Sequence, residues 1–129
     1  MSYYNSKTIQ NVSFDKVMKR VIEALKQEGF GVLTEIDVKA TMKKKLNIDY
    51  RPYMILGACN PPFAHKALMA ENKIGTMLPC NVIVQEITDG AIEVSAVDPI
   101  ASMMAVENEG LAGIATEINE KFKSVIAAL

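Results

Sequence analysis

The sequence has 129 residues, of which 50% are hydrophobic and 22% are charged, a composition typical of one folded domain rather than of a disordered chain. Fourteen basic and fifteen acidic side chains give a net charge of -1, which argues against bulk attraction to nucleic acid or to anionic membranes. Two cysteines are too few for the disulfide framework of a small secreted domain, and one histidine excludes a site built from several imidazole ligands of one chain.

No targeting or membrane segment is recognisable in the sequence. The first ten residues are polar and lack the charged-then-apolar pattern of a signal peptide. No stretch approaches the roughly 18 to 20 apolar residues that a membrane-spanning helix needs. We therefore expect a cytoplasmic protein with two free thiols and with neither membrane nor nucleic-acid partners.

The first elements are a short strand over residues 3–9 and an amphipathic helix. Ser13 is a favoured N-cap residue, and Gly29 is expected to end the helix in a left-handed conformation. Between them, hydrophobic residues recur at helical spacing, namely Phe14, Val17, Met18, Val21, Ile22 and Leu25. This spacing predicts a helix that packs one stripe against the core.

A change of period predicts strands in the next segment. Apolar and charged residues alternate over residues 34–40, which is typical of a strand with one solvated face. A short basic helix is predicted over residues 42–46, and a more buried strand over residues 50–58. Pro52 is expected at the start of that strand or at a bulge, because proline cannot donate to the ladder.

The second half of the chain begins with a helix over residues 61–72, with Asn60 as its N-cap and Pro61 at its first position. A connection over residues 72–78 leads to strands over residues 81–87 and 91–97, which Asp89-Gly90 joins as a hairpin turn. Asp98 is predicted to cap a brief helix through residue 105. A last amphipathic helix follows over residues 111–129.

The resulting order is β-α-β-(α)-β-α-β-β-α-α over one domain, residues 1–129. Two amphipathic helices need a sheet face to cover, and the alternating strands supply one. The sequence therefore predicts an α+β protein, a two-layer sandwich in which a mixed sheet of about five strands is covered by amphipathic helices.

The candidate functional residues centre on Cys59, which precedes the Asn60-Pro61 helix start. A thiol near the unpaired N–H groups of a helix N-terminus can have a lowered pKa and a greater capacity to bind metal. Cys80 stands in a similar segment, Pro79-Cys80-Asn81, at the start of a strand. If the two strands are neighbours, both thiols meet at one end of the sheet and permit a disulfide, a relay or a two-thiolate metal site. The alternative is that both are small packing residues.

His65 lies on the second turn of the helix that begins at Pro61. It is a candidate general base or third ligand near Cys59, and the alternative is a solvated surface residue. A zinc site would need a fourth group, from water or from a partner chain. The sequence names no cofactor.

Other charged residues indicate a functional site less clearly than the cysteines do. Lys39, the lysines at 43–45 and Arg51 form a basic cluster that we interpret as a solvated face, the alternative being a site for an anionic small molecule. Carboxylates are scattered, and Glu86 and Glu93 flank the hairpin turn, where they could pair across it. Phosphate-loop, dinucleotide-binding, nucleophile-elbow and zinc-protease motifs are all missing from the sequence.

Several segments taken together resemble a known family. These are residues 29–33 (GFGVL), 53–62 (YMILGACNPP), 78–82 (LPCNV) and 97–99 (VDP), which resemble the family of unknown function numbered 302 over nearly the whole chain. The resemblance implies a small α+β protein of bacteria or archaea with a β-α-β start and a tendency to form homodimers. It implies no activity. It does direct attention to Cys59, Asn60, Cys80 and Asn81.

Two functional hypotheses follow. The first is a ligand-binding or thiol-active module, in which Cys59 and Cys80 form a redox or metal site supported by Asn60, Pro61, Asn81 and His65. The second is a non-catalytic homodimeric domain in which these segments are helix caps and strand starts. A hydrolase or transferase built on the carboxylates and His65 lacks a nucleophile motif. Whether the protein is an enzyme is not decided by its sequence.

Overall fold

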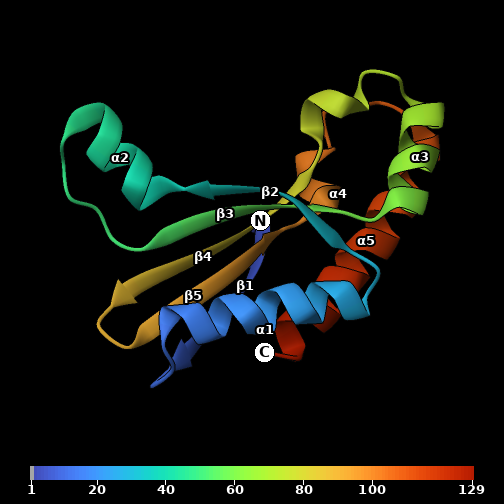
Figure 1. Cartoon of the computed structure of the whole chain (residues 1–129). Helices are drawn as coiled ribbons and strands as arrows, with labels where there is room; N and C mark the ends of the chain where they lie inside the picture. Colours follow the sequence, from blue (N-terminus) through green and yellow to red (C-terminus); the bar gives the residue numbers. More distant parts are fainter. Residues whose placement is uncertain (1) are drawn as a thin grey trace.

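The computed structural model describes residues 2–129, whose strands form one five-stranded sheet in the order β1-β5-β4-β3-β2 (Figure 1). The strands are β1 (Tyr4–Gln10), β2 (Gly31–Asp37), β3 (Tyr53–Cys59), β4 (Cys80–Thr88) and β5 (Ala91–Val97). All neighbouring strands are antiparallel. The prediction of a mixed sheet is wrong in this respect, because the helix after β1 carries the chain to the opposite edge of the sheet instead of to a parallel neighbour.

The helices agree with the predicted α+β order. They are α1 (Phe14–Gln27), α2 (Val38–Leu46), α3 (Pro61–Ala70), α4 (Pro99–Ser102) and α5 (Glu109–Ala127), with a 3-10 turn, η1, over Ile74–Met77. Figure 1 shows α1 and α5 lying across the same face of the sheet, whereas α2 projects from the far end of β2 and β3. One face of the sheet is therefore covered by helices and the other is open, and α2 projects beyond both layers.

The core fills the space between the covered sheet face and the two long helices. Val17, Val21 and Leu25 of α1 are fully buried, as the helical spacing predicted. From α5, Phe122 is fully buried and stacks on Phe30 with ring centroids 4.7 Å apart. Alternate strand residues complete this core, namely Leu56, Ala58, Cys80, Val82, Val84, Ile92, Val94 and Ala96. The strand residues between them face the open side of the sheet.

Local capping signals account for most helix ends. The Ser13 side chain accepts a hydrogen bond from the backbone N–H of Lys16, and Gly29 has a φ of 85°, so both predicted caps of α1 are confirmed. Asp98 likewise caps α4 through the backbone N–H of Ile100, at 2.9 Å. Gly90 has a φ of 79° in the predicted β4–β5 hairpin, which is also confirmed.

A cap also explains where the strand prediction over residues 34–40 is wrong. The strand begins at Gly31 and ends at Asp37, whose side chain accepts a hydrogen bond of 2.9 Å from the backbone N–H of Ala40. This N-cap starts α2 at Val38, so residues 38–40 are helical despite their alternating pattern. The predicted brief helix after Asp98 is also shorter than expected, since α4 ends at Ser102.

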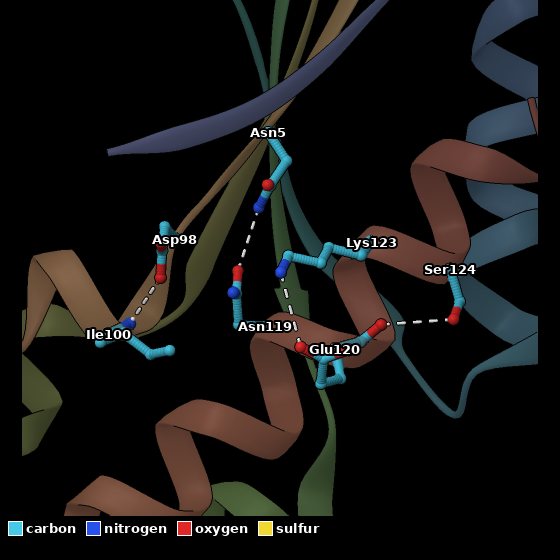
Figure 2. A network of polar contacts seen from close by, with 7 residues as sticks. All are labelled: Asn5, Asp98, Ile100, Asn119, Glu120, Lys123 and Ser124. Carbon is cyan, nitrogen blue, oxygen red and sulfur yellow. Dashed lines mark hydrogen bonds and ion pairs between the residues drawn. The ribbon is translucent and has the colours of Figure 1, made fainter. Parts of the chain in front are cut away.

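A buried polar contact fastens the last helix to the first strand. Asn119 of α5 is only 4% exposed, and its side-chain oxygen accepts a hydrogen bond of 3.0 Å from Asn5 of β1 (Figure 2). The side-chain ammonium of Lys7, on the same strand, donates to the backbone carbonyl of Leu129 at 2.6 Å. These two hydrogen bonds hold α5 at the β1 edge of the sheet. The first also gives the buried side chain of Asn119 a partner.

Gly57 of β3 is the position where the sheet depends most on the absence of a side chain. A Cβ there would clash with the Thr34 hydroxyl and would lie 2.6 Å from Cγ of Pro79. We therefore expect Gly57→Ala to lower the free energy of unfolding by about 1 to 3 kcal/mol in urea titrations.

The matched control is Gly113→Ala in α5, where an added Cβ meets no atom within 4 Å. Alanine is the better helix former, so this variant is expected to gain up to about 1 kcal/mol. Equal effects of the two substitutions would contradict the close packing assigned to Gly57.

Candidate functional site

An apolar cavity of about 260 Å³ lies where the adjoining ends of β3 and β4 meet α3 and α5. Ala58, Cys59 and Cys80 contribute from the strand ends. Helix α3 contributes one wall, formed by Phe63, Ala64, Ala67 and Leu68. The remaining lining comes from other segments, namely Phe30, Leu33, Asn60, Leu78, Pro79, Met103 and Ile118. Leu33 and Leu68 are 66% and 43% exposed, so apolar side chains also surround the mouth. An open apolar cavity of this kind suits a small uncharged molecule.

The two cysteines both line this cavity, and both are free. In the β3–β4 ladder Ala58 pairs with Cys80, and Cys59 directly follows Ala58. The two thiols are expected to meet only if these strands are neighbours, and β3 and β4 do pair. Cys80 is 6% exposed, whereas Cys59 is half-buried.

The electrostatic surroundings of Cys80 oppose its ionisation. Burial raises the pKa of the Cys80 thiol to about 11, and the neighbouring Cys59 adds to the shift. The group is therefore a protonated, uncharged thiol at neutral pH. This disfavours a role for Cys80 as a resolving thiolate and is compatible with its lining an apolar binding site.

Asn60 lies at the N-cap position of α3, as predicted, but its side chain does not cap that helix. It is 8% exposed, and its amide nitrogen donates to the backbone carbonyl of Glu28 at 3.4 Å. Asn60 therefore connects the start of α3 to the end of α1. The backbone carbonyl of Asn60 accepts the first helical bond, from Ala64, at 2.9 Å. The hydrogen bond from the Asn60 side chain to Glu28 therefore holds α3, one wall of the cavity, against the end of α1.

The other predicted supporting residues do not line the cavity. Pro61 begins α3 and His65 lies on its second turn; both are exposed, and neither is among the residues that line the cavity. Asn81 lies on the open face of the sheet, because successive residues of β4 point to opposite faces and Cys80 points into the core.

The donor atoms at the cavity give the metal hypothesis little support. Within residues 2–129, no three or more His, Cys, Asp and Glu side chains are grouped so as to hold a metal ion. The thioether of Met103 lines the same cavity as Cys59 and Cys80, which makes the cavity rich in sulfur rather than in nitrogen or oxygen donors. This donor set suits soft ligands and not zinc held by histidine.

Sequence reasoning missed most of the cavity. The helical pattern places Phe63, Ala64 and Ala67 on a helix but does not link their side of α3 to Cys59. Met103 follows α4 and is brought in from another part of the chain. The small residues of α3 were a usable signal, because alanines facing strand ends leave room that a larger side chain would fill.

The predicted charged features are solvated or differently paired. The lysines at 43–45 lie on α2, which has no buried residue, in agreement with a solvated face. The expected pairing of Glu86 with Glu93 is wrong, because the register pairs Glu93 with Gln85 and Glu86 with Ile92. Glu86 instead accepts a hydrogen bond from the backbone N–H of Gly90 at 3.2 Å.

The antiparallel sheet with helices on one face defines the chain as an α+β protein, and a small apolar cavity lies at one end of the sheet. The family profile described as "Domain of unknown function DUF302" matches residues 5–129. The chain belongs to this family, as the resemblance in its sequence indicated.

A solved structure gives the same fold. The crystal structure of an uncharacterized conserved DUF302 protein from Bacillus stearothermophilus has a TM-score of 0.90 and 26% sequence identity to this chain. The match covers 99% of this chain and 98% of that one. No curated protein matches the sequence. In residues 2–129 no helix is long and apolar enough to cross a membrane.

The environment of Cys80 predicts its reactivity. In the folded protein near neutral pH we expect iodoacetamide to leave Cys80 unmodified, because the thiol is buried and protonated, whereas half-buried Cys59 reacts. The alkylation rate of Cys80 should rise about tenfold per pH unit until the pH reaches the pKa of about 11. Mass spectrometry of single-cysteine variants measures each rate.

In the Cys59→Ser variant the only thiol that can react is Cys80, and in the Cys80→Ser variant it is Cys59. In denaturant both thiols should react at similar rates, which controls for intrinsic reactivity. Fast modification of Cys80 in the folded protein at neutral pH would show that its environment favours the thiolate instead.

Proposed function

We propose that this protein binds a small, uncharged, apolar ligand in the cavity between α3 and the ends of β3 and β4. The observation that carries the proposal is a cavity of about 260 Å³ whose lining and mouth are almost wholly apolar. An apolar cavity of roughly 150 Å³ is already sufficient to bind benzene. We place the function in a reducing compartment, the cytoplasm, because both cysteines are free.

The state of the thiols favours binding over redox catalysis. With its pKa near 11, Cys80 supplies an uncharged sulfur surface rather than a nucleophile. Met103 adds a polarisable thioether to the same wall. Cys59 is the more exposed of the two thiols, so a soft electrophile or a metal ion that reached the cavity would bind to its sulfur.

Filling the cavity tests this proposal. Ala64 is half-buried on the cavity wall, so Ala64→Phe should place a ring in the ligand space and weaken binding of indole at least about tenfold. Binding is followed by chemical-shift changes in ¹H–¹⁵N spectra. Native mass spectrometry of the protein as purified, with and without reductant, identifies any resident occupant.

The matched control is Met69→Phe, which adds a ring to the same helix at a position that is 76% exposed. It should bind indole as the parent protein does. If both variants bind equally, or if the parent protein shows no saturable binding of indole, the cavity is not the ligand site.

A second candidate function is that of a homodimeric interaction domain. The observation that favours it is the arm, defined as residues 36–50, in which α2 has no buried residue and Ile36, Leu46, Ile48 and Tyr50 are each at least 40% exposed. Figure 1 shows α2 projecting away from the sheet and its covering helices. A second copy of this chain would bury these side chains.

Sedimentation velocity tests this second function. We expect the parent protein to sediment as a dimer and the double variant Leu46→Glu, Ile48→Glu to sediment as a monomer with an unchanged circular dichroism spectrum. Met69→Glu introduces charge at an exposed apolar residue outside the arm and should remain dimeric. A monomeric parent protein would contradict the proposed dimer.

A further inference from the structure

The open face of the sheet contains a hollow of about 360 Å³ that is separate from the apolar cavity. No lining residue is shared between the two. Tyr3, Tyr4 and Tyr53 form its walls, and Glu93 and Ser95 of β5 lie at its floor next to Gln85 of β4. The two sites thus differ in chemistry: one is apolar and sulfur-lined, and the other is aromatic with a carboxylate.

Glu93 is held in a defined orientation by its neighbours. The side-chain amide of Gln85 donates to Oε1 of Glu93 at 3.1 Å, and the Ser95 hydroxyl donates to the same oxygen at 3.4 Å. The second carboxylate oxygen accepts no hydrogen bond from residues 2–129. It is therefore available to a ligand.

None of the described residues forms an ion pair with this half-buried carboxylate. Among residues 2–129 no Lys, Arg or His nitrogen lies within 4.0 Å of Glu93. The nearest cation in the network is Arg51, whose guanidinium donates to Gln85 at 3.2 Å and so is separated from Glu93 by the Gln85 side chain. A partly desolvated carboxylate without an ionic partner attracts an external cation.

The tyrosine rings around the hollow provide aromatic faces that can attract a cation. The rings of Tyr3 and Tyr4 pack edge to face, with centroids 5.0 Å apart and an angle of 75°. Burial raises the pKa of Tyr53, with smaller contributions from Tyr50, Glu93 and Tyr3, whereas the Arg51 guanidinium lowers it. Of these groups, Tyr3 and Glu93 also line the hollow. Aromatic faces attract ammonium groups through their electron-rich π systems, and a nearby carboxylate adds to that attraction.

We propose that this hollow binds a small organic ammonium ion, with Glu93 pairing with the charged nitrogen and the tyrosine rings covering its carbon atoms. An anionic ligand is excluded by the carboxylate. An inorganic divalent cation is disfavoured, since one carboxylate is a poor ligand set for it. The volume lies within the range of small-molecule sites.

Titration with paired cationic and neutral probes tests this site. We expect n-butylammonium and tetramethylammonium to shift the backbone signals of Gln85, Glu93 and Ser95 saturably, and 1-butanol to leave them unchanged. Glu93→Gln keeps the shape of the side chain and its Ser95 contact but removes the charge, so the affinity for both cations should fall about tenfold. Tyr53→Leu should also weaken binding, whereas Tyr53→Phe should preserve it.

The matched control is Glu35→Gln, which removes an exposed carboxylate from β2 on the other face of the sheet, opposite buried Leu56. Its affinity should equal that of the parent protein. Equal binding by Glu93→Gln and Glu35→Gln overturns the proposal, as does the lack of saturable shifts in the parent protein. Tyr53→Leu keeps the test decisive should Glu93→Gln fail to fold.

Discussion

Burial of one face of the antiparallel sheet beneath α1 and α5 is the interaction on which the rest of the structure depends. Phe122 and Leu25 have no exposed surface, and together with Phe30 they join both helices to the sheet. Each fully buried apolar side chain of this size contributes about 1.5 to 3 kcal/mol. Two helices cover only one face, so the opposite face stays open and the strand ends beyond the helices stay only partly filled. Both candidate sites arise from this incomplete coverage.

The chemistry of each site follows from its position relative to the core. The cavity with Cys59 and Cys80 adjoins the covered face, where desolvation keeps the buried thiol uncharged and leaves apolar side chains as the available contacts. The hollow over Glu93 is on the open face, where a carboxylate remains partly hydrated and aromatic rings stand at its edge. One sheet thus presents an apolar site near its core and a charged aromatic site on its outer surface.

Asn60 illustrates how one residue serves the fold and the site together. Its side chain bonds to the end of α1 instead of capping α3, and Gly29 leaves room for it, since a Cβ at Gly29 would lie 3.1 Å from the amide nitrogen of Asn60. This packing sets the position of the α3 wall relative to Cys59. The Cys59-Asn60-Pro61 segment is therefore a structural junction as well as part of a cavity.

The sequence by itself determined the element order, the caps of α1 and α4 and the buried stripe of α1, because these depend on spacing and on contacts within a few residues. It also identified Cys59 and Cys80 as candidate functional residues, but it left open whether the two thiols lie close together. Only the tertiary structure decided that the sheet is antiparallel throughout, that His65 and Asn81 lie outside the cavity, and that Met103 and α3 complete it. Strand order and cavity shape depend on contacts between residues distant in the chain. The charged hollow was hidden for the same reason, since Tyr3, Tyr53 and Glu93 come together only when β1, β3 and β5 share one sheet.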